Sequence, residues 1–236
     1  MTRLLRAEVL KLRTVRTLVW IGLGMVALVL ISSVSVVASA STLTTAADDR
    51  AVARISAVAV IFALMTGIVI IGSEGSSGTI TQTLLVAPAR ERVLAAKAGV
   101  AVAVGLFLAV LAEALMLAIV VPGVSLSVHN ARLVLVGVLV GGAVGGAAGV
   151  GIGAIFHRQG PAIGFALLWL LIAENILVLA FRDNIKYFPG HVFAAAVSGE
   201  HGSSRLIGTW AGVLGASLYA VAFLAAGTAA LSRRDI

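Results

Sequence analysis

Cysteine is absent from this chain of 236 residues, proline occurs only 4 times, and charged residues make up only 11%. Without cysteine there can be no disulfide bond, no thiol catalysis and no metal site built on thiolates. The scarcity of charge accompanies 60% hydrophobic residues and a mean hydropathy of +1.11. Such values lie outside the range of ordinary soluble domains and indicate a membrane protein.

A nucleotide-binding loop is missing as well. The pattern G-x-x-x-x-G-K-[S/T], whose backbone and lysine cradle ATP phosphates, does not occur in the sequence. The glycine-rich run GGAVGGAAGVGIG lacks the lysine and lies within an apolar stretch of bilayer length. We therefore expect that this chain binds no cofactor of its own and hydrolyses no ATP alone.

Long apolar runs are what the sequence does contain. A helix needs about 20 apolar residues to cross a bilayer. The expected spans are roughly residues 17–40, 51–72, 95–121, 132–156, 161–181 and 207–231. The sequence thus predicts an all-α polytopic membrane protein with six transmembrane helices in a single domain, residues 1–236. The first apolar run is too long for the core of a signal peptide.

The basic residues are distributed unevenly between the two sides. With the N-terminus inside, eleven of the 17 Lys and Arg residues fall on the cytoplasmic side. By the positive-inside rule, both termini are expected in the cytoplasm. The membrane is expected to be the cell (plasma) membrane. In a membrane protein the location of the basic residues matters more than their sum, so the net charge of +7 does not indicate nucleic acid. The lipid bilayer is an expected partner and nucleic acid is not.

Residues 1–16, MTRLLRAEVLKLRTVR, precede the first span. At helical spacing, leucine and valine side chains fall on one side and arginine side chains on the other, which predicts an interfacial amphipathic helix. The alternative is a disordered basic leader that only follows the positive-inside rule.

A polar segment, residues 73–92 (SEGSSGTITQTLLVAPARER), separates the second and third spans. Thr79 and Gln82 have the spacing of a capping box, and Pro88 cannot continue a helix. The pattern therefore predicts a short cytoplasmic amphipathic helix, whose apolar face is Ile80, Leu84 and Leu85. A helical loop lying on the lipid surface would show the same amphipathicity.

Two blocks of sequence resemble the ABC-2 type transporter permeases. The first is RAEVLKLRTVRT near the N-terminus. The second consists of Glu74, Gly78, Thr79, Ile80, Thr83, Leu84, Pro88, Arg90, Arg92 and Lys97. In motif terms the resemblance covers about residues 3–20 and 73–97, and the six-span topology extends it along the chain.

This resemblance implies a function as the membrane subunit of an ATP-driven exporter. It implies that the first block is a connecting helix at the interface, and that residues 182–206 form short helices on the outer side. It also implies a coupling helix that docks on a cytosolic ABC ATP-binding protein, which holds ATP and Mg²⁺. The coupling residues would be Glu74, Gly78, Thr79, Ile80, Leu84, Leu85, Pro88, Arg90 and Arg92. A second copy of the permease, or a related permease, would complete the complex.

Two carboxylates lie within expected spans: Glu113, and Glu174 beside Asn175. Because a charge at membrane depth is costly, such groups face protein or water and are candidates for the substrate path. Structural pairing with a neighbouring helix is the equal alternative.

Small residues repeat in the fourth span. Glycine recurs every four residues, at Gly137, Gly141, Gly145, Gly149 and Gly153. Such a stripe lets another helix approach closely. The partner helix would belong to the same chain or, alternatively, to a second protomer.

Histidines are scattered at positions 129, 157, 191 and 201. No spacing places two of them on one helix face, so no metal site is expected and they are interpreted as solvated loop residues. In the outer segment, Tyr187 and Phe188 suit the level of the lipid headgroups.

Two other classes of function are weighed against the exporter subunit. The first is an intramembrane enzyme and the second an ion-coupled secondary transporter, each using Glu113 and Glu174. A His, Cys or Ser partner at catalytic spacing is missing for the first, and repeated halves with interrupted helices are missing for the second. The sequence does not identify the transported substrate.

Overall fold

The computed structural model describes residues 16–39, 45–77, 90–200, 202 and 206–232, and all regular structure in them is helical. Within these residues, six helical segments are long and apolar enough to cross a membrane. The prediction of an all-helical chain with six helices of membrane-spanning length and apolarity is therefore confirmed. The predicted interfacial helix lies outside the described residues, except for Arg16, which begins the first span.

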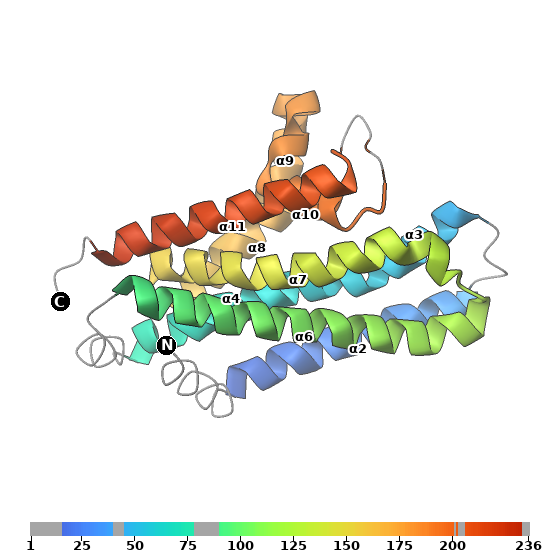
Figure 1. The fold of residues 1–236 in the computed structure, drawn as a ribbon, viewed down its shortest axis with the longest axis horizontal. Helices are drawn as coiled ribbons and strands as arrows, with labels where there is room; N and C mark the ends of the chain where they lie inside the picture. The colour runs from blue at the N-terminus through green and yellow to red at the C-terminus, as the bar shows by residue number, and fades with distance from the viewer. Residues whose placement is uncertain (1–15, 40–44, 78–89, 201, 203–205, 233–236) are drawn as a thin grey trace.

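The spans and their connections follow in chain order (Figure 1). The first is α2 (Arg16–Ser39), and the second comprises α3 (Ala46–Ala53), a 3₁₀ turn (Arg54–Ala57) and α4 (Val58–Ser77). The third and fourth are α6 (Arg90–Val124) and α7 (Val128–Phe156). The fifth comprises α8 (Gln159–Leu168), a π-helical segment (Trp169–Ala173) and α9 (Glu174–Phe181). A 3₁₀ helix (Arg182–Tyr187) and α10 (Pro189–Ala196) lead to the sixth, α11 (Thr209–Ser232).

The second span begins earlier than its apolar run. Thr45 caps α3, because its side chain accepts a hydrogen bond from the Asp48 amide at 3.1 Å while the Asp48 carboxylate accepts one from the Thr45 amide at 3.0 Å. This capping box satisfies two amides that a helix start leaves free. The polar turn before residue 51 is consequently helical.

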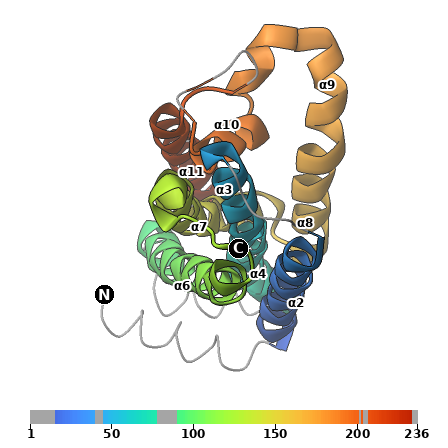
Figure 2. The same ribbon diagram turned by 90° about the vertical axis from the view of Figure 1, so that its right-hand side faces the viewer.

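Helix α7 occupies the middle of the bundle and contacts α4, α6 and α11 (Figures 1 and 2). Four members of its glycine stripe lie against α4, and Gly137 lies against the last residue of α10. A Cβ on Gly145 would stand 3.0 Å from the Val60 carbonyl oxygen, and one on Gly153 only 2.9 Å from that of Ile68. The neighbours of the stripe are thus helices of the same chain.

Other glycines let two more helices approach α7. A Cβ on Gly142 would stand 2.7 Å from the carbonyl oxygen of Gly105 on α6. On α11, a Cβ on Gly227 would stand 2.9 Å from the carbonyl oxygen of Gly151. Small residues therefore bring α7 into near backbone contact with three helices, as is usual for packing inside membranes.

The end of α4, the start of α6 and the end of α11 lie together at one end of the bundle. Leu94 near the start of α6 packs in one cluster with Ile70 and Ile71 of α4 and with Leu231 near the end of α11. Helix α2 also begins at this end (Figure 1). Helix α4 therefore ends, and α6 begins, at the same end of the bundle at which α2 begins and α11 ends.

Polar contacts fasten the opposite end. The Asp49 carboxylate, only 5% exposed, accepts hydrogen bonds from the Ser127 amide (3.1 Å) and the Asn130 side chain (2.7 Å) at the start of α7. Arg54 donates two hydrogen bonds to the Ser198 carbonyl and forms an ion pair with Glu200. The bonds of Asp49 hold α3 against α7, and those of Arg54 hold the 3₁₀ turn after α3 against the connection from α10 to α11.

Candidate functional site

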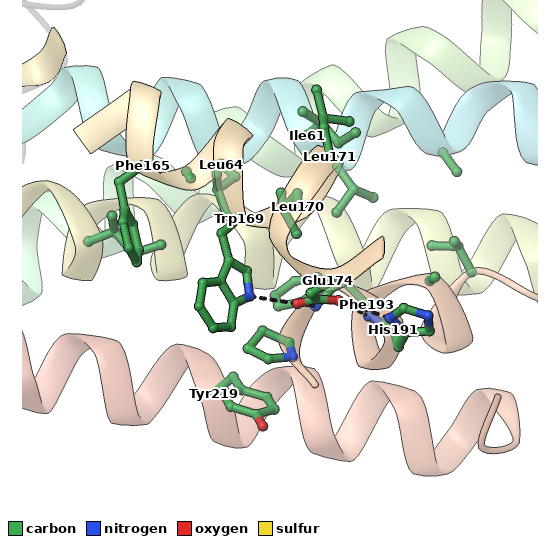
Figure 3. Close-up of a pocket in the computed structure, with 18 of the residues that line it drawn as sticks. Ile61, Leu64, Phe165, Trp169, Leu170, Leu171, Glu174, His191, Phe193 and Tyr219 are labelled. Atoms are coloured by element: carbon green, nitrogen blue, oxygen red, sulfur yellow. Dashed lines mark hydrogen bonds and ion pairs between the residues drawn. The ribbon is translucent and has the colours of Figure 1, made fainter. Parts of the chain in front are cut away.

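A cavity of about 680 Å³ lies between α4, α8, α9, α10 and α11 (Figure 3). Cavities of roughly 300–1,000 Å³ suit small-molecule ligands. Its floor is aliphatic and comes mainly from α4, with Val60, Ile61 and Leu64 among the lining residues. In Figure 2, α8 and α9 form a column that stands apart from α11.

Aromatic side chains form two walls of this cavity. On the fifth span the rings of Phe165 and Trp169 stack with centroids 6.1 Å apart, and on α11 those of Tyr219 and Phe223 stack 6.2 Å apart. Each pair is separated by four residues, which places both rings on one helix face. Trp169 and Tyr219 come from opposite sides of the cavity (Figure 3).

Glu174 forms the polar centre of the site and is only 2% exposed. Its Oε1 accepts hydrogen bonds from Trp169 Nε1 and from the Gly190 amide, both at 2.7 Å. Its Oε2 accepts one from the His191 amide at 3.1 Å and lies 2.9 Å from His191 Nδ1. Both carboxylate oxygens are thus engaged, so this buried charge is compensated within the protein.

The π-helical segment explains how Trp169 reaches Glu174. Five residues in a regular α-helix turn the chain well past one full turn and would separate these side chains around the axis. In the π-helical turn the Glu174 amide bonds to the Trp169 carbonyl, so the two residues lie one above the other. Single π turns inside helices are frequent at functional sites.

The Glu174 carboxylate also caps the N-terminus of α10. Pro189 stands at the start of this helix, where its missing N–H is not needed. The next two amides, those of Gly190 and His191, are among those that a helix start leaves without backbone partners, and both bond to Glu174. The carboxylate therefore caps α10 from a different span.

Two of the three predicted substrate-path residues lie in this cavity, namely Glu174 and Asn175. Asn175 is exposed and donates one hydrogen bond to the Leu171 carbonyl. Glu113 is not among the lining residues, although it is buried (8% exposed) on α6. Its Oε1 has no hydrogen-bond partner among the described residues. The structure does not bring the two carboxylates together.

The interpretation of His191 as a solvated loop residue is wrong. His191 belongs to α10 and bonds to Glu174, because α10 folds back against α11 instead of continuing outward. The Tyr219 hydroxyl, in the middle of α11, donates a hydrogen bond to the Tyr187 carbonyl at 2.7 Å. Pro189 was the available signal, since proline commonly marks the first turn of a helix.

The predicted coupling residues fall mostly outside the described part of the chain. Gly78, Thr79, Ile80, Leu84, Leu85 and Pro88 lie outside the described residues, as do the side chains of Glu74 and Arg90. Arg92 is exposed in the first turn of α6. Lys97, the last residue of the resemblance, is 1% exposed inside the same helix.

Few side chains in the lining of the cavity can form hydrogen bonds. The described residues that line it include no serine, threonine, cysteine or lysine. Its hydrogen-bonding groups are Glu174, Asn175, His191, Trp169 and Tyr219 among apolar neighbours.

Comparisons with protein-family models, with curated proteins and with solved structures give no match. The function is therefore inferred from the sequence motifs, the bundle and the cavity.

Proposed function

We propose that this chain is the transmembrane permease subunit of an ABC-2 type ATP-driven exporter. In this proposal the cavity beside Glu174 belongs to the substrate path. ATP and Mg²⁺ bind to a separate cytosolic ATP-binding subunit, and a second permease copy or a related permease completes the complex. Both termini face the cytoplasm of a cell whose plasma membrane the six helices cross.

The proposal is supported mainly by the position in the bundle of the block that resembles the ABC-2 permease motif. The block from Glu74 to Lys97 connects α4 to α6, at the end of the bundle where α2 begins and α11 finishes. A partner that docks on this connection would act on both flanking helices at once. Because α4 lines the cavity and packs along α7, its movement would reach the substrate path.

Two other classes of function receive less support. An intramembrane enzyme or an ion-coupled transporter would use Glu113 and Glu174 as a working pair. Glu174 lies in the cavity wall and Glu113 does not, and both oxygens of Glu174 are bonded within the protein. A pair acting on one substrate would need to share one site.

The coupling segment provides the test. Leu84→Asp puts a charge on the apolar face predicted to fill a cleft of the ATPase, as an amphipathic helix fills a groove. We expect this variant to insert into the membrane normally and to lose a co-purifying ATPase. Gln82→Asp is the matched control, since helical spacing places residue 82 on the opposite face. Equal retention of the ATPase by both variants would refute the docking role.

A further inference from the structure

Aromatic rings are concentrated at the cavity. The chain has 8 Phe, 3 Trp and 2 Tyr, and five of these line this one cavity. They are Phe165, Trp169, Phe193, Tyr219 and Phe223. A lipid tail would be accommodated by aliphatic side chains alone, whereas facing ring pairs favour a ligand that itself carries rings or a diffuse positive charge.

The described part of the cavity lining contains an acidic side chain but no lysine or arginine. Among the described lining residues there is one carboxylate, Glu174, and neither lysine nor arginine. The bonds that Trp169 Nε1 and the Gly190 and His191 amides donate come from uncharged groups, so they stabilise the negative charge of Glu174 without cancelling it. In an apolar cavity this charge is weakly screened, so it attracts cations and repels anions over several ångströms.

The bonding of Glu174 narrows the class of cation further. Both of its oxygens are occupied by N–H donors of the protein, and the carboxylate is buried. A compact ammonium group needs several hydrogen-bond acceptors in place of its water, and the cavity offers few. A cation whose charge is spread or shielded by rings has no such need.

We propose that this cavity binds a lipophilic aromatic cation, held between the ring pair of the fifth span and the ring pair of α11 within the field of Glu174. This inference deepens the proposed function and rests on it for one point, that the bound molecule is the one exported. Binding itself requires no ATPase.

The test compares two probes of the same shape and opposite charge. Tetraphenylphosphonium and tetraphenylborate are dialysed to equilibrium against the full chain purified in detergent, with a protein-free micelle blank. We expect saturable binding of the phosphonium and at least tenfold weaker specific binding of the borate. Equal affinity for both ions, or no saturable binding of the phosphonium, would overturn the proposal.

Substitutions of aromatic residues test whether the phosphonium binds in this cavity. Trp169→Leu should weaken phosphonium binding about tenfold, while Trp169→Phe, which keeps a ring, should retain most of it. Trp210→Leu is the matched control, because Trp210 is 61% exposed on α11 and does not line the cavity. If Trp169→Leu fails to fold, Phe223→Leu on the opposite wall replaces it, with an expected loss of about threefold. Equal losses in the Trp210 control and the cavity variants would overturn the assignment.

The two proposals fail separately. Saturable phosphonium binding without any co-purifying ATPase would leave the site standing and remove the exporter. An ATPase lost specifically in Leu84→Asp, together with absent phosphonium binding, would leave the exporter standing and remove this ligand class.

Discussion

Removing the Glu174 carboxylate should release the start of α10. In Glu174→Ala, the amides of Gly190 and His191 lose the acceptor that caps the helix, and Trp169 loses the partner of its indole N–H. Loss of a helix cap costs about 0.5–2 kcal/mol, and a hydrogen bond to a charged group is worth about 1.5–3 kcal/mol. Since α10 keeps its contacts with α11, we expect a net loss of about 3 kcal/mol in the free energy of opening α10.

Hydrogen exchange read by mass spectrometry measures this opening locally. A loss of about 3 kcal/mol corresponds to roughly a hundredfold lower protection of the amides of residues 189–196. Protection in α7 should change little, because its packing does not involve Glu174. Glu174→Gln should fall in between, since it keeps one carbonyl oxygen but places an NH₂ group against the His191 amide.

Asn175→Ala is the control for this experiment. Asn175 is adjacent and exposed, and its one described hydrogen bond goes to its own helix. We expect unchanged protection of α10 in this variant. If Glu174→Ala also leaves the exchange of α10 unchanged, the carboxylate does not hold that helix, and the account of the site fails.

Two further predictions concern packing and orientation. Gly149→Ala would drive its new methyl group into the Leu64 carbonyl and should destabilise the bundle by about 1–3 kcal/mol, whereas Gly22→Ala, with open space around it, should be neutral in the same thermal unfolding assay. Equal stability of both variants would mean that α4 and α7 do not touch at Gly149. Because the chain has no cysteine, Ala47→Cys and Ser232→Cys can be labelled separately with an impermeant thiol reagent in intact cells. We expect label at position 47 only, and the reverse pattern would invert the proposed topology.

Hydropathy was sufficient to predict the six spans, because a bilayer imposes one length on every crossing helix. It missed the early start of the second span, where Thr45 and Asp48 form a capping box among polar residues. It also missed the π-helical turn at Trp169–Ala173, since one extra residue in a turn leaves an apolar sequence apolar.

The spacing of the glycines predicted a packing face on α7 but not the helices that pack against it. A repeat of four residues predicted a face for close approach, and the five glycines do meet neighbouring backbone or side chains. Spacing within one helix carries no information about which helix lies opposite. The identification of α4 and α10 as the partners therefore required the structure.

The cavity was not predictable for a related reason. Its two ring pairs, at residues 165 and 169 and at residues 219 and 223, are 54 residues apart in the sequence, and each pair alone resembles ordinary lipid-facing residues. Glu174 was a candidate because a buried charge is costly, but its partner His191 could be found only once α10 was seen to fold back.

The central claim is that a separate ATPase drives this membrane subunit through the α4–α6 connection. The most direct measurement is ATP hydrolysis by the complex purified on the tagged chain from native membranes, with mass spectrometry of its subunits. The account predicts a vanadate-sensitive ATPase activity, a co-purified chain carrying G-x-x-x-x-G-K-[S/T], and loss of both in Leu84→Asp but not in Gln82→Asp. A stable, correctly inserted chain that purifies without any such subunit and without ATP hydrolysis would contradict it.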